Sequence, residues 1–299
     1  MSRLLACDWG STNLRAWVLD AGGEVLAQRN FPLGVQKLAP GEAARRFAEE
    51  VRPALQAQDL PALLCGAVGS NIGWTTVPYV DCPADLQHLA ERITQVAPNV
   101  WIAPGVRCQL GEGESCVLRG EETIALGWIE QDLKRHRGDW LICQPGTHSM
   151  WLFMQDAKLK HFVGAFTGEL YAVLSAHSIL RSSGQGRDLA VFDEGLAAAG
   201  DGDALLNRLY TARSRVAGRG ADQESTADYL SGLLIGAEVA ATPGLLGLAD
   251  APVQLVGDAG LCERYERALK RRGTPVIRHE GEPAVRAGLL ALAQMGGLL

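Results

Sequence analysis

The sequence predicts an α/β protein of two lobes, in which each lobe opens with a β-hairpin and continues as a mixed sheet flanked by helices. The main observation is an internal repeat: residues 141–149 follow the pattern of residues 5–13, 136 positions further along, and an apolar strand follows each copy. Strand-like and helix-like segments then alternate. At 299 residues and 47% hydrophobic residues, the chain can bury one large core or two modest ones.

The first lobe begins with three successive strands. Apolar runs at 4–7 and 14–19 flank a turn-rich segment, and a second turn leads to a third strand at 24–28. Further on, periodicity predicts helices over 41–58, 86–96 and 121–133, and buried strands over 61–68 and 100–103. The charged stretch 134–139 follows the last of these helices. We therefore expect domains over 1–135 and 136–299.

The second lobe repeats the hairpin and then becomes mainly helical. The helices are expected over 171–180, 193–199, 204–210 and 229–241. An apolar strand over 253–257 ends in Gly257 and precedes an amphipathic helix over 261–272, and a last strand and helix follow at 276–279 and 284–295. This order of strand, glycine turn and helix is typical of a nucleotide-binding segment.

Composition excludes several classes of protein. The formal net charge is −6 and the basic residues are scattered, which argues against a nucleic-acid surface. The most apolar stretch, 230–248, is interrupted by Glu238 and Pro243, so no membrane span is expected. The seven cysteines are too far apart in sequence for zinc-ribbon or redox motifs, and no secretory signal is evident. We therefore expect a cytoplasmic protein that acts on a small solute.

The two hairpin loops carry glycine and hydroxyl residues that suit a polyphosphate. On both sides of a cleft they would offer backbone N–H groups and hydroxyls to a nucleotide triphosphate, without a P-loop, because each loop leads into a strand rather than a helix. Asp8 precedes the first loop and Gln144 the second. A single carboxylate suits Mg²⁺, so Asp8 is the candidate metal residue. The alternative is that Asp8 only shapes the turn.

Three segments resemble the phosphate and adenosine motifs of the actin, hexokinase and heat-shock chaperone superfamily, at 8–13, 146–149 and 255–257. Nearly the whole chain is similar to the 2-dehydro-3-deoxygalactonokinase family. The similarity is carried by an ordered series of motifs at 8–17, 69–74, 119–123, 145–149, 167–170, 177–180 and 230–236.

The resemblance implies a two-lobed actin-like ATPase fold of the ribonuclease H-like type. It also implies transfer of the γ-phosphoryl group of ATP, with Mg²⁺, to the 6-hydroxyl of 2-dehydro-3-deoxy-D-galactonate in galactonate catabolism. Met150 departs from the basic residue expected after the second loop. The implied nucleotide-binding residues are Asp8, Gly10, Ser11, Thr12, Asn13, Gly146, Thr147, His148, Ser149 and Gly257.

A kinase of this type needs a base beside the attacking hydroxyl. In related carbohydrate kinases the base opens a helix before the second phosphate loop, and Glu121 occupies the comparable place, with Glu122 behind it. Asp8 completes the set of candidate catalytic carboxylates. Alternatively, both glutamates only stabilise a helix N-terminus through its dipole. Asp81 is a second alternative for the base.

The substrate would bring a carboxylate of its own, which calls for an arginine. Arg15 and Arg119 are the candidates, while Ser70, Asn71 and Trp74 would contact sugar hydroxyls or stack on the ligand. Trp74 could equally be an ordinary core residue. Two other functions stay open, namely a kinase of another sugar or sugar acid and an ATP-driven switch, although the chain lacks the extra subdomains of the switch proteins. A homodimer also stays open.

Overall fold

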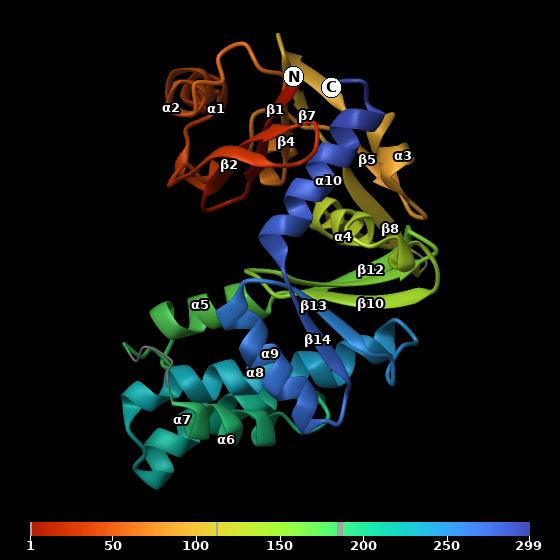
Figure 1. The fold of residues 1–299 in the computed structure, drawn as a ribbon. Helices are drawn as coiled ribbons and strands as arrows, with labels where there is room; N and C mark the ends of the chain where they lie inside the picture. The colour runs from red at the N-terminus through yellow and green to blue at the C-terminus, as the bar shows by residue number, and fades with distance from the viewer. Residues whose placement is uncertain (1, 112, 184–187) are drawn as a thin grey trace. The chain divides into compact units, whose positions relative to one another are not determined.

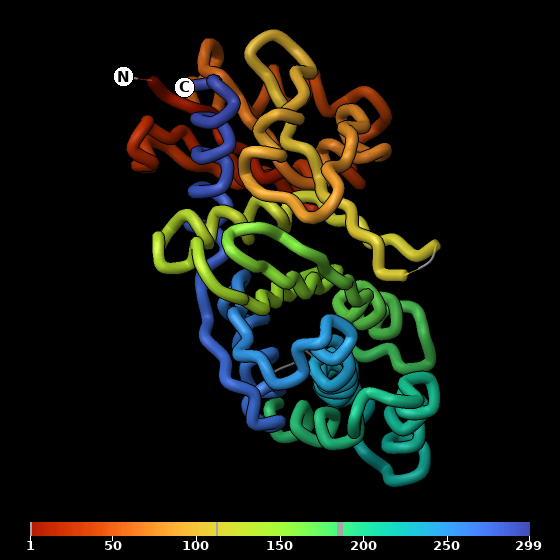
Figure 2. Tube along the Cα trace, turned by 90° about the vertical axis from the view of Figure 1, so that its right-hand side faces the viewer, coloured from red at the N-terminus to blue at the C-terminus, as the bar shows by residue number. Residues whose placement is uncertain are grey.

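The computed structural model describes residues 2–111, 113–183 and 188–299, which form two compact units. Unit 1 comprises Met1–Asp139, Met154–His161 and Gly281–Leu299, and unit 2 comprises Trp140–Phe153 and Phe162–Glu280. Each unit contains one of the two large sheets (Figure 1). The C-terminal helix, blue in Figure 2, returns to the red and orange N-terminal strands of unit 1.

The sheet of unit 1 has six strands in the order β3-β2-β1-β4-β7-β6. The first three pair antiparallel, as the sequence predicts, and β1, β4 and β7 run parallel. The edge strand β6 pairs antiparallel with β7. The strands are β1 (Arg3–Trp9), β2 (Leu14–Asp20), β3 (Val25–Phe31), β4 (Ala62–Cys65), β6 (Thr94–Ala97) and β7 (Val100–Ile102).

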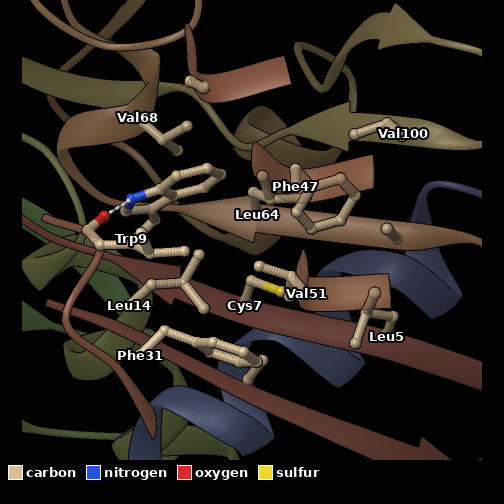
Figure 3. Close-up of a cluster of buried hydrophobic side chains, with 14 of the residues drawn as sticks. Leu5, Cys7, Trp9, Leu14, Phe31, Phe47, Val51, Leu64, Val68 and Val100 are labelled. Atoms are coloured by element: carbon tan, nitrogen blue, oxygen red, sulfur yellow. Dashed lines mark hydrogen bonds between the residues drawn. The ribbon is translucent and has the colours of Figure 1, made fainter. Parts of the chain in front are cut away.

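One face of this sheet is covered by a continuous helical segment made of α1 (Glu42–Arg46), η2 (Phe47–Val51) and α2 (Arg52–Ala54). Alternate residues of β1, namely Leu5, Cys7 and Trp9, point into the resulting core because side chains alternate along a strand (Figure 3). The Trp9 ring stacks on Phe47 at 6.1 Å, and its indole N–H donates to the Leu33 carbonyl. The phosphate-loop hairpin therefore starts from a rigid strand.

The other face of the sheet is covered by α10 (Gly281–Met295), which packs on β1, β4, α3 (Leu86–Ala90) and α4 (Glu121–Glu130). α4 and α10 approach so closely that glycines stand at the contact. A Cβ on Gly127 would lie 2.0 Å from the Ala284 carbonyl oxygen, and one on Gly288 would lie 2.1 Å from the Thr123 carbonyl oxygen. This contact fixes the helix that starts with the two candidate catalytic glutamates.

Adding a methyl group at this contact is expected to destabilise the fold. Gly127→Ala should lower the free energy of unfolding by about 1–3 kcal/mol, because the helices must move apart to admit it. Urea unfolding followed by circular dichroism measures the change. The matched control is Gly218→Ala in α7 (Leu205–Arg219), where a Cβ meets no atom within 4 Å and helix propensity predicts a gain of up to about 1 kcal/mol. Equal stability of Gly127→Ala and the natural protein would contradict the close packing.

Unit 1 contains a smaller sheet that sequence periodicity does not predict. Its strands, in the order β5-β8-β9, are β5 (Tyr79–Asp81), β8 (Gly105–Gly111) and β9 (Glu114–Leu118). The helix expected over 86–96 was wrong in its second half, because α3 ends at Ala90 and β6 follows. Thr94 and Val96 are β-branched, and the segment pairs with the edge of β7.

The sheet of unit 2 has the strand order β12-β11-β10-β13-β14, in which β10, β13 and β14 run parallel. This order matches β3-β2-β1-β4-β7 in unit 1, so the internal repeat predicted from the sequence is confirmed as a repeat of topology. The strands are β10 (Asp139–Gln144), β11 (Ser149–Gln155), β12 (Lys158–Ala165), β13 (Val253–Gly257) and β14 (Val276–Glu280).

The helices of unit 2 pack around α8, whose residues are almost all buried. α8 contacts α5, α6, α7 and α9, and its side chains join those of the sheet in one core with Trp151, Phe192 and Tyr265. Among the described residues, no helix has the length and apolar character needed to cross a membrane. The helices are α5 (Thr167–His177), α6 (Leu189–Ala199), α7, α8 (Thr226–Leu245) and α9 (Ala259–Arg271), longer than expected from sequence at several ends.

Candidate active site

The first hairpin loop, residues 10–13, is tied down by its carbonyl groups. Three successive carbonyls accept hydrogen bonds of 3.1–3.2 Å from the segment 34–36: Gly10 from Val35, Ser11 from Gln36, and Thr12 from Gly34. Since the N–H of a trans peptide points opposite to its C=O, the N–H groups of Ser11, Thr12 and Asn13 point away from this support. Three neighbouring donors of this kind suit the oxygens of a phosphate group.

Asp8 lies on β1 just before this loop, opposite Arg15 on β2 and Cys65 on β4. Its Oδ2 atom is 2.5 Å from Nη2 of Arg15, and its side chain is 13% exposed against 42% for Arg15. Arg15 thus orients the Asp8 carboxylate. Whether Arg15 also contacts a substrate stays a prediction.

Two glycines bring the start of α4 close to Asp8. Gly120, at φ 113°, precedes α4, and a Cβ there would lie 3.1 Å from Cα of Gly66. A Cβ on Gly66, which follows β4, would in turn lie 3.3 Å from Oδ1 of Asp8. The positive φ of both residues is one that glycine adopts without strain. The sequence-predicted carboxylates of unit 1 therefore lie in one place.

Glu122 is the fixed member of this group. It is 1% exposed, Oε2 accepts from the Gly120 N–H at 2.7 Å, and Oε1 accepts from the Thr123 hydroxyl at 2.8 Å. Burial raises the pKa of its carboxyl, while these hydrogen bonds oppose the rise. Glu122 therefore stabilises the N-terminus of α4. This is the role that the alternative interpretation of the sequence gave to both glutamates.

Glu121 has the electrostatic character of a general base. Burial, and then the neighbouring charge of Glu122, raise the pKa of its carboxyl to about 7. Backbone hydrogen bonds, one of them from the Arg119 N–H to Oε2 at 3.1 Å, oppose the rise, and the charge of Asp8 adds to it. A carboxylate whose pKa lies near neutral pH can take a proton from a hydroxyl and release it again.

Asp81, the alternative base, has the opposite properties. It is exposed on β5 and paired with Arg107, whose Nε is 2.7 Å from Oδ1. The hydrogen bond from Arg107 lowers the pKa of its carboxyl. Such a carboxylate is a weak proton acceptor, so the geometry favours Glu121.

The carboxylates of unit 1 fit a Mg²⁺ ion that is held mainly by a nucleotide. Asp8 and Glu122 both raise the pKa of Glu121, so the negative charges of these carboxylates act on one another, and a divalent cation would relieve this repulsion. Among the described residues, no three His, Cys, Asp or Glu side chains are grouped to hold a metal alone. Protein-bound Mg²⁺ typically takes one or two carboxylates plus phosphate oxygens and water, and Asp8 would supply one.

Arg119 is a partly buried cation that makes no ion pair within 4 Å among the described residues, although its charge opposes the rise in the pKa of the Glu122 carboxyl. Its Nη2 donates to the Val77 carbonyl at 2.7 Å, and its guanidinium lies 4.2 Å from the centre of the Tyr79 ring. Its Nε and Nη1 atoms are buried and have no hydrogen-bond partner in the described structure. A desolvated cation of this kind is stabilised by an anion, so a carboxylate ligand near Arg119 would complete the site.

The loop over 70–74 follows η3 (Ala67–Gly69) and carries the other predicted substrate residues. The Ser70 hydroxyl donates to the Ala67 carbonyl at 2.7 Å and shapes the turn. Trp74 packs against Phe47, with 5.7 Å between the ring centres, and so joins the core of unit 1. This agrees with the alternative that Trp74 is an ordinary core residue. Asn71 is exposed. The substrate contacts of all three stay predictions.

In unit 2, the second hairpin loop is braced by the start of α5. A Cβ on Gly168 would lie 2.3 Å from the Gly146 carbonyl oxygen, and the Glu169 N–H donates to the Thr147 carbonyl at 2.8 Å. The side chains of His148 and Glu169 meet at 2.6 Å. Gly146 and Thr147 thus form a defined loop, as a phosphate-binding segment requires.

A buried polar network supports this loop from below. The fully buried Ser149 hydroxyl is 2.6 Å from the Tyr265 hydroxyl, which donates to Glu238 at 2.7 Å. The Trp151 indole N–H donates to the other oxygen of Glu238 at 2.7 Å. Burial raises the pKa of the Glu238 carboxyl, against the effect of these hydrogen bonds. Ser149 therefore holds the loop, and its predicted contact with the nucleotide stays untested.

Gly257 lies beside the second loop at the end of β13. A Cβ there would be 3.6 Å from the Pro145 carbonyl oxygen, and Asp258 next to it caps α9 by accepting from the Leu261 N–H at 3.0 Å. The strand, glycine turn and helix predicted for this segment are confirmed. A nucleotide base at this turn would lie next to the phosphate loop, at the carboxyl ends of parallel strands.

Sequence reasoning missed three residues that shape the second loop, namely Glu169, Glu238 and Tyr265. Glu169 lies in a motif used only for family resemblance, and Glu238 served only to exclude a membrane span. Glu238 could have been noticed as a single glutamate in an apolar helix. A carboxylate that is buried in this way needs hydrogen-bond partners, so it indicates a polar network around it. A hollow of about 960 Å³ near the other end of α5, lined in part by His177 and Arg213, contains none of the predicted site residues.

Solved structures share the fold. A crystal structure of a Sinorhizobium meliloti protein, named as a presumed 2-dehydro-3-deoxygalactonokinase, is 31% identical and aligns with a TM-score of 0.84 over 97% of this chain and 98% of that one. The activator of the 2-hydroxyisocaproyl-CoA dehydratase from Clostridium difficile, solved with bound ADPNP, aligns with a TM-score of 0.52 at 13% identity, over 99% and 96% of the two chains. The second likeness concerns the fold alone.

The fold and the two loop sites define a carbohydrate kinase of the two-lobed actin-like ATPase fold, which uses ATP. The profile of the 2-keto-3-deoxy-galactonokinase family matches residues 8–292, and the chain belongs to this family. It is 34% identical over 295 residues to the 2-dehydro-3-deoxygalactonokinase of Escherichia coli (strain K12), with 98% of each chain covered.

Proposed function

We propose that the protein transfers the γ-phosphoryl group of ATP to the 6-hydroxyl of 2-dehydro-3-deoxy-D-galactonate, in the cytoplasmic breakdown of galactonate. The observation that carries the proposal is the combination in unit 1 of Glu121, whose carboxyl has a pKa of about 7, and Arg119, a partly buried guanidinium with two unsatisfied nitrogen atoms, two residues apart. The first suits proton removal from a hydroxyl, and the second suits the carboxylate of a sugar acid. Family membership supports the same substrate.

Phosphoryl transfer requires that the 6-hydroxyl lose its proton as its oxygen attacks the γ-phosphorus. The Glu121 carboxylate accepts that proton, and ADP leaves as the bond to the bridging oxygen breaks. The Arg119 N–H holds Oε2 of Glu121, and Glu122 anchors the start of the helix behind it. The chain thereby keeps the base fixed before substrate arrives, which lowers the entropic cost of reaching the transition state.

The ATP phosphates would bind to the N–H groups of Ser11, Thr12 and Asn13 in unit 1 and to the loop of Gly146, Thr147 and His148 in unit 2. The adenosine would lie at Gly257. Mg²⁺, held by Asp8 and the phosphates, would neutralise charge that develops on the transferred group. In this proposal the predicted domain over residues 1–135 binds the sugar acid, and the predicted domain over residues 136–299 binds the adenosine.

Substrate choice would follow from Arg119 and the loop over 70–74. A carboxylate that accepts from one of the unsatisfied donors of Arg119 would also supply a counter-charge, so acids are favoured over neutral sugars. Asn71 is exposed and is proposed to contact a sugar hydroxyl. Arg15 is committed to Asp8, which leaves Arg119 as the better carboxylate ligand.

A coupled ADP-release assay tests the proposal. The purified protein is given ATP, Mg²⁺ and, in turn, 2-dehydro-3-deoxy-D-galactonate, its gluconate epimer, plain hexonates and neutral hexoses. We expect turnover with the galactonate derivative, at a kcat/KM at least about tenfold above the epimer and far above any neutral sugar. Turnover with neutral sugars alone would overturn the substrate, and sugar-independent hydrolysis would favour an ATP-driven switch. Light scattering on the same sample tests whether the protein forms a homodimer.

A further inference from the structure

His148 is the one ionisable side chain of the second loop, and it is held from outside the loop. Its Nε2 atom lies 2.6 Å from Oε2 of Glu169, and its ring meets the Phe166 ring edge-on at 4.7 Å between centres. The two polar side chains are about half exposed, and Phe166 is 67% exposed. A hydrogen-bonded imidazole and carboxylate and an aromatic ring are thus gathered on the open side of the loop.

Glu169 is itself fixed to the loop whose histidine it contacts. Its backbone N–H donates to the Thr147 carbonyl at 2.8 Å, and the close approach of Gly168 to Gly146 leaves no room for a side chain between them. Carboxylate and imidazole therefore share one rigid frame. The frame limits the imidazole to a narrow range of orientations, at a small entropic cost because the partners are already ordered.

The loop has no lysine or arginine side chain to offer a phosphate. Met150, where a basic residue was expected, is buried, and it lies against Gly164 of β12. Gly146 and Thr147 supply no charge. His148 therefore carries the one side-chain N–H group of this loop, and its hydrogen bond to Glu169 at 2.6 Å sets how the ring is turned.

We infer that Glu169 is a positioning residue for nucleotide binding, which holds the His148 imidazole in the orientation that contacts the ATP phosphates. The inference rests on the proposed function, since it takes the second loop as a phosphate site. The positioning role and simple charge repulsion predict opposite effects of removing the Glu169 carboxylate. A carboxylate near a polyphosphate repels it, so removing that carboxylate should tighten binding if Coulomb repulsion alone acts. A positioning role requires the reverse.

Four full-length proteins form the test: the natural sequence, His148→Gln, Glu169→Gln and the double variant. The dissociation constant of the non-hydrolysable analogue ADPNP with Mg²⁺ is measured by calorimetry, and KM and kcat for ATP and sugar acid are measured separately. Exposed ion pairs contribute little to stability, so the variants should fold. Glu194→Gln is the matched control, because Glu194 is also an exposed helix carboxylate, paired with Arg215 at 2.9 Å.

We expect His148→Gln to weaken ADPNP binding roughly tenfold or more, the value of a charge-assisted hydrogen bond. Glu169→Gln should weaken it about three- to tenfold, and the double variant should equal His148→Gln alone, because Glu169 acts only through the histidine. The KM for sugar acid and the control should not change. Additive losses, or tighter binding by Glu169→Gln, would overturn the inference. No ADPNP binding by the natural protein would instead refute the proposed function.

Discussion

Glu121→Gln is expected to lower kcat for phosphoryl transfer by roughly 10²- to 10⁴-fold, the contribution typical of a positioned general base. Glutamine keeps the size of the side chain and can still accept from the Arg119 N–H, but it cannot take a proton. Binding of ATP and of sugar acid should therefore change little. Rapid-quench measurement of a single turnover separates this loss of chemistry from any change in product release.

The pH dependence of the natural enzyme follows from the same carboxyl. The base must be ionised to work, so kcat/KM should fall about tenfold per pH unit below the pKa of about 7 and level off above it. The folded state favours the protonated form, since the pKa lies above its ordinary value of 4.5. The contribution of Glu121 to the free energy of unfolding therefore falls as the pH rises from 4.5 through about 7. Glu121→Gln should accordingly melt at a higher temperature than the natural protein at pH 8.

The control is Glu130→Gln, at the opposite end of the same helix, where the carboxylate faces His136 at 3.3 Å. It should retain the kcat and the pH profile of the natural enzyme. A pH profile that persists unchanged in a still-active Glu121→Gln would show that another group is the base. Glu122→Gln is the next variant in that event, although its hydrogen bonds to Gly120 and Thr123 give it a structural role.

Arg119→Met is expected to raise the KM for the sugar acid by roughly 10- to 100-fold, since a charge-assisted hydrogen bond contributes about 1.5–3 kcal/mol. The KM for ATP should stay within about twofold, since Arg119 lies outside both predicted phosphate loops. Methionine keeps much of the packing on Tyr79 and Val77 while it removes the charge. Initial rates with each substrate varied in turn measure the two effects.

The control for this substitution is Arg107→Met, which removes an exposed guanidinium paired with Asp81 on the neighbouring strands β8 and β5. It should leave both KM values unchanged. Thermal melting of both variants checks that Arg119→Met does not act by unfolding the small sheet. If Arg119→Met raised the KM for ATP and spared that for sugar acid, the carboxylate role of Arg119 would be refuted.

The sequence was sufficient for the frame of the fold because hairpins and glycine turns are local. The two copies of the hairpin, and the strand that ends at Gly257, need only short-range patterns. Strands β5 and β6 escaped prediction because they are only three and four residues long, and β8 and β9 escaped it because much of them is exposed, so none shows the apolar alternation that predicts a strand. The spacing of apolar residues favoured a helix over 94–96. The pairing of this segment with β7 makes it a strand instead.

The site was predictable as a set of motifs but not as a set of roles. Glu121 and Glu122 are adjacent in sequence, and only burial and hydrogen bonds distinguish the base from the cap. Trp74 was equally plausible as ligand platform or core; it is partly buried and packs against Phe47, and its contact with a ligand stays a prediction. The network of Ser149, Tyr265 and Glu238 joins residues that are 116 and 27 positions apart, and no local pattern reveals such contacts.

The most direct measurement is the product formed from ATP, Mg²⁺ and 2-dehydro-3-deoxy-D-galactonate, identified by phosphorus and carbon NMR. We expect one phosphomonoester on the 6-hydroxyl, formed in equal amount with ADP by the natural enzyme and absent over the same time with Glu121→Gln. Release of ADP without a sugar phosphate, or a phosphate on another hydroxyl, would contradict the proposed reaction.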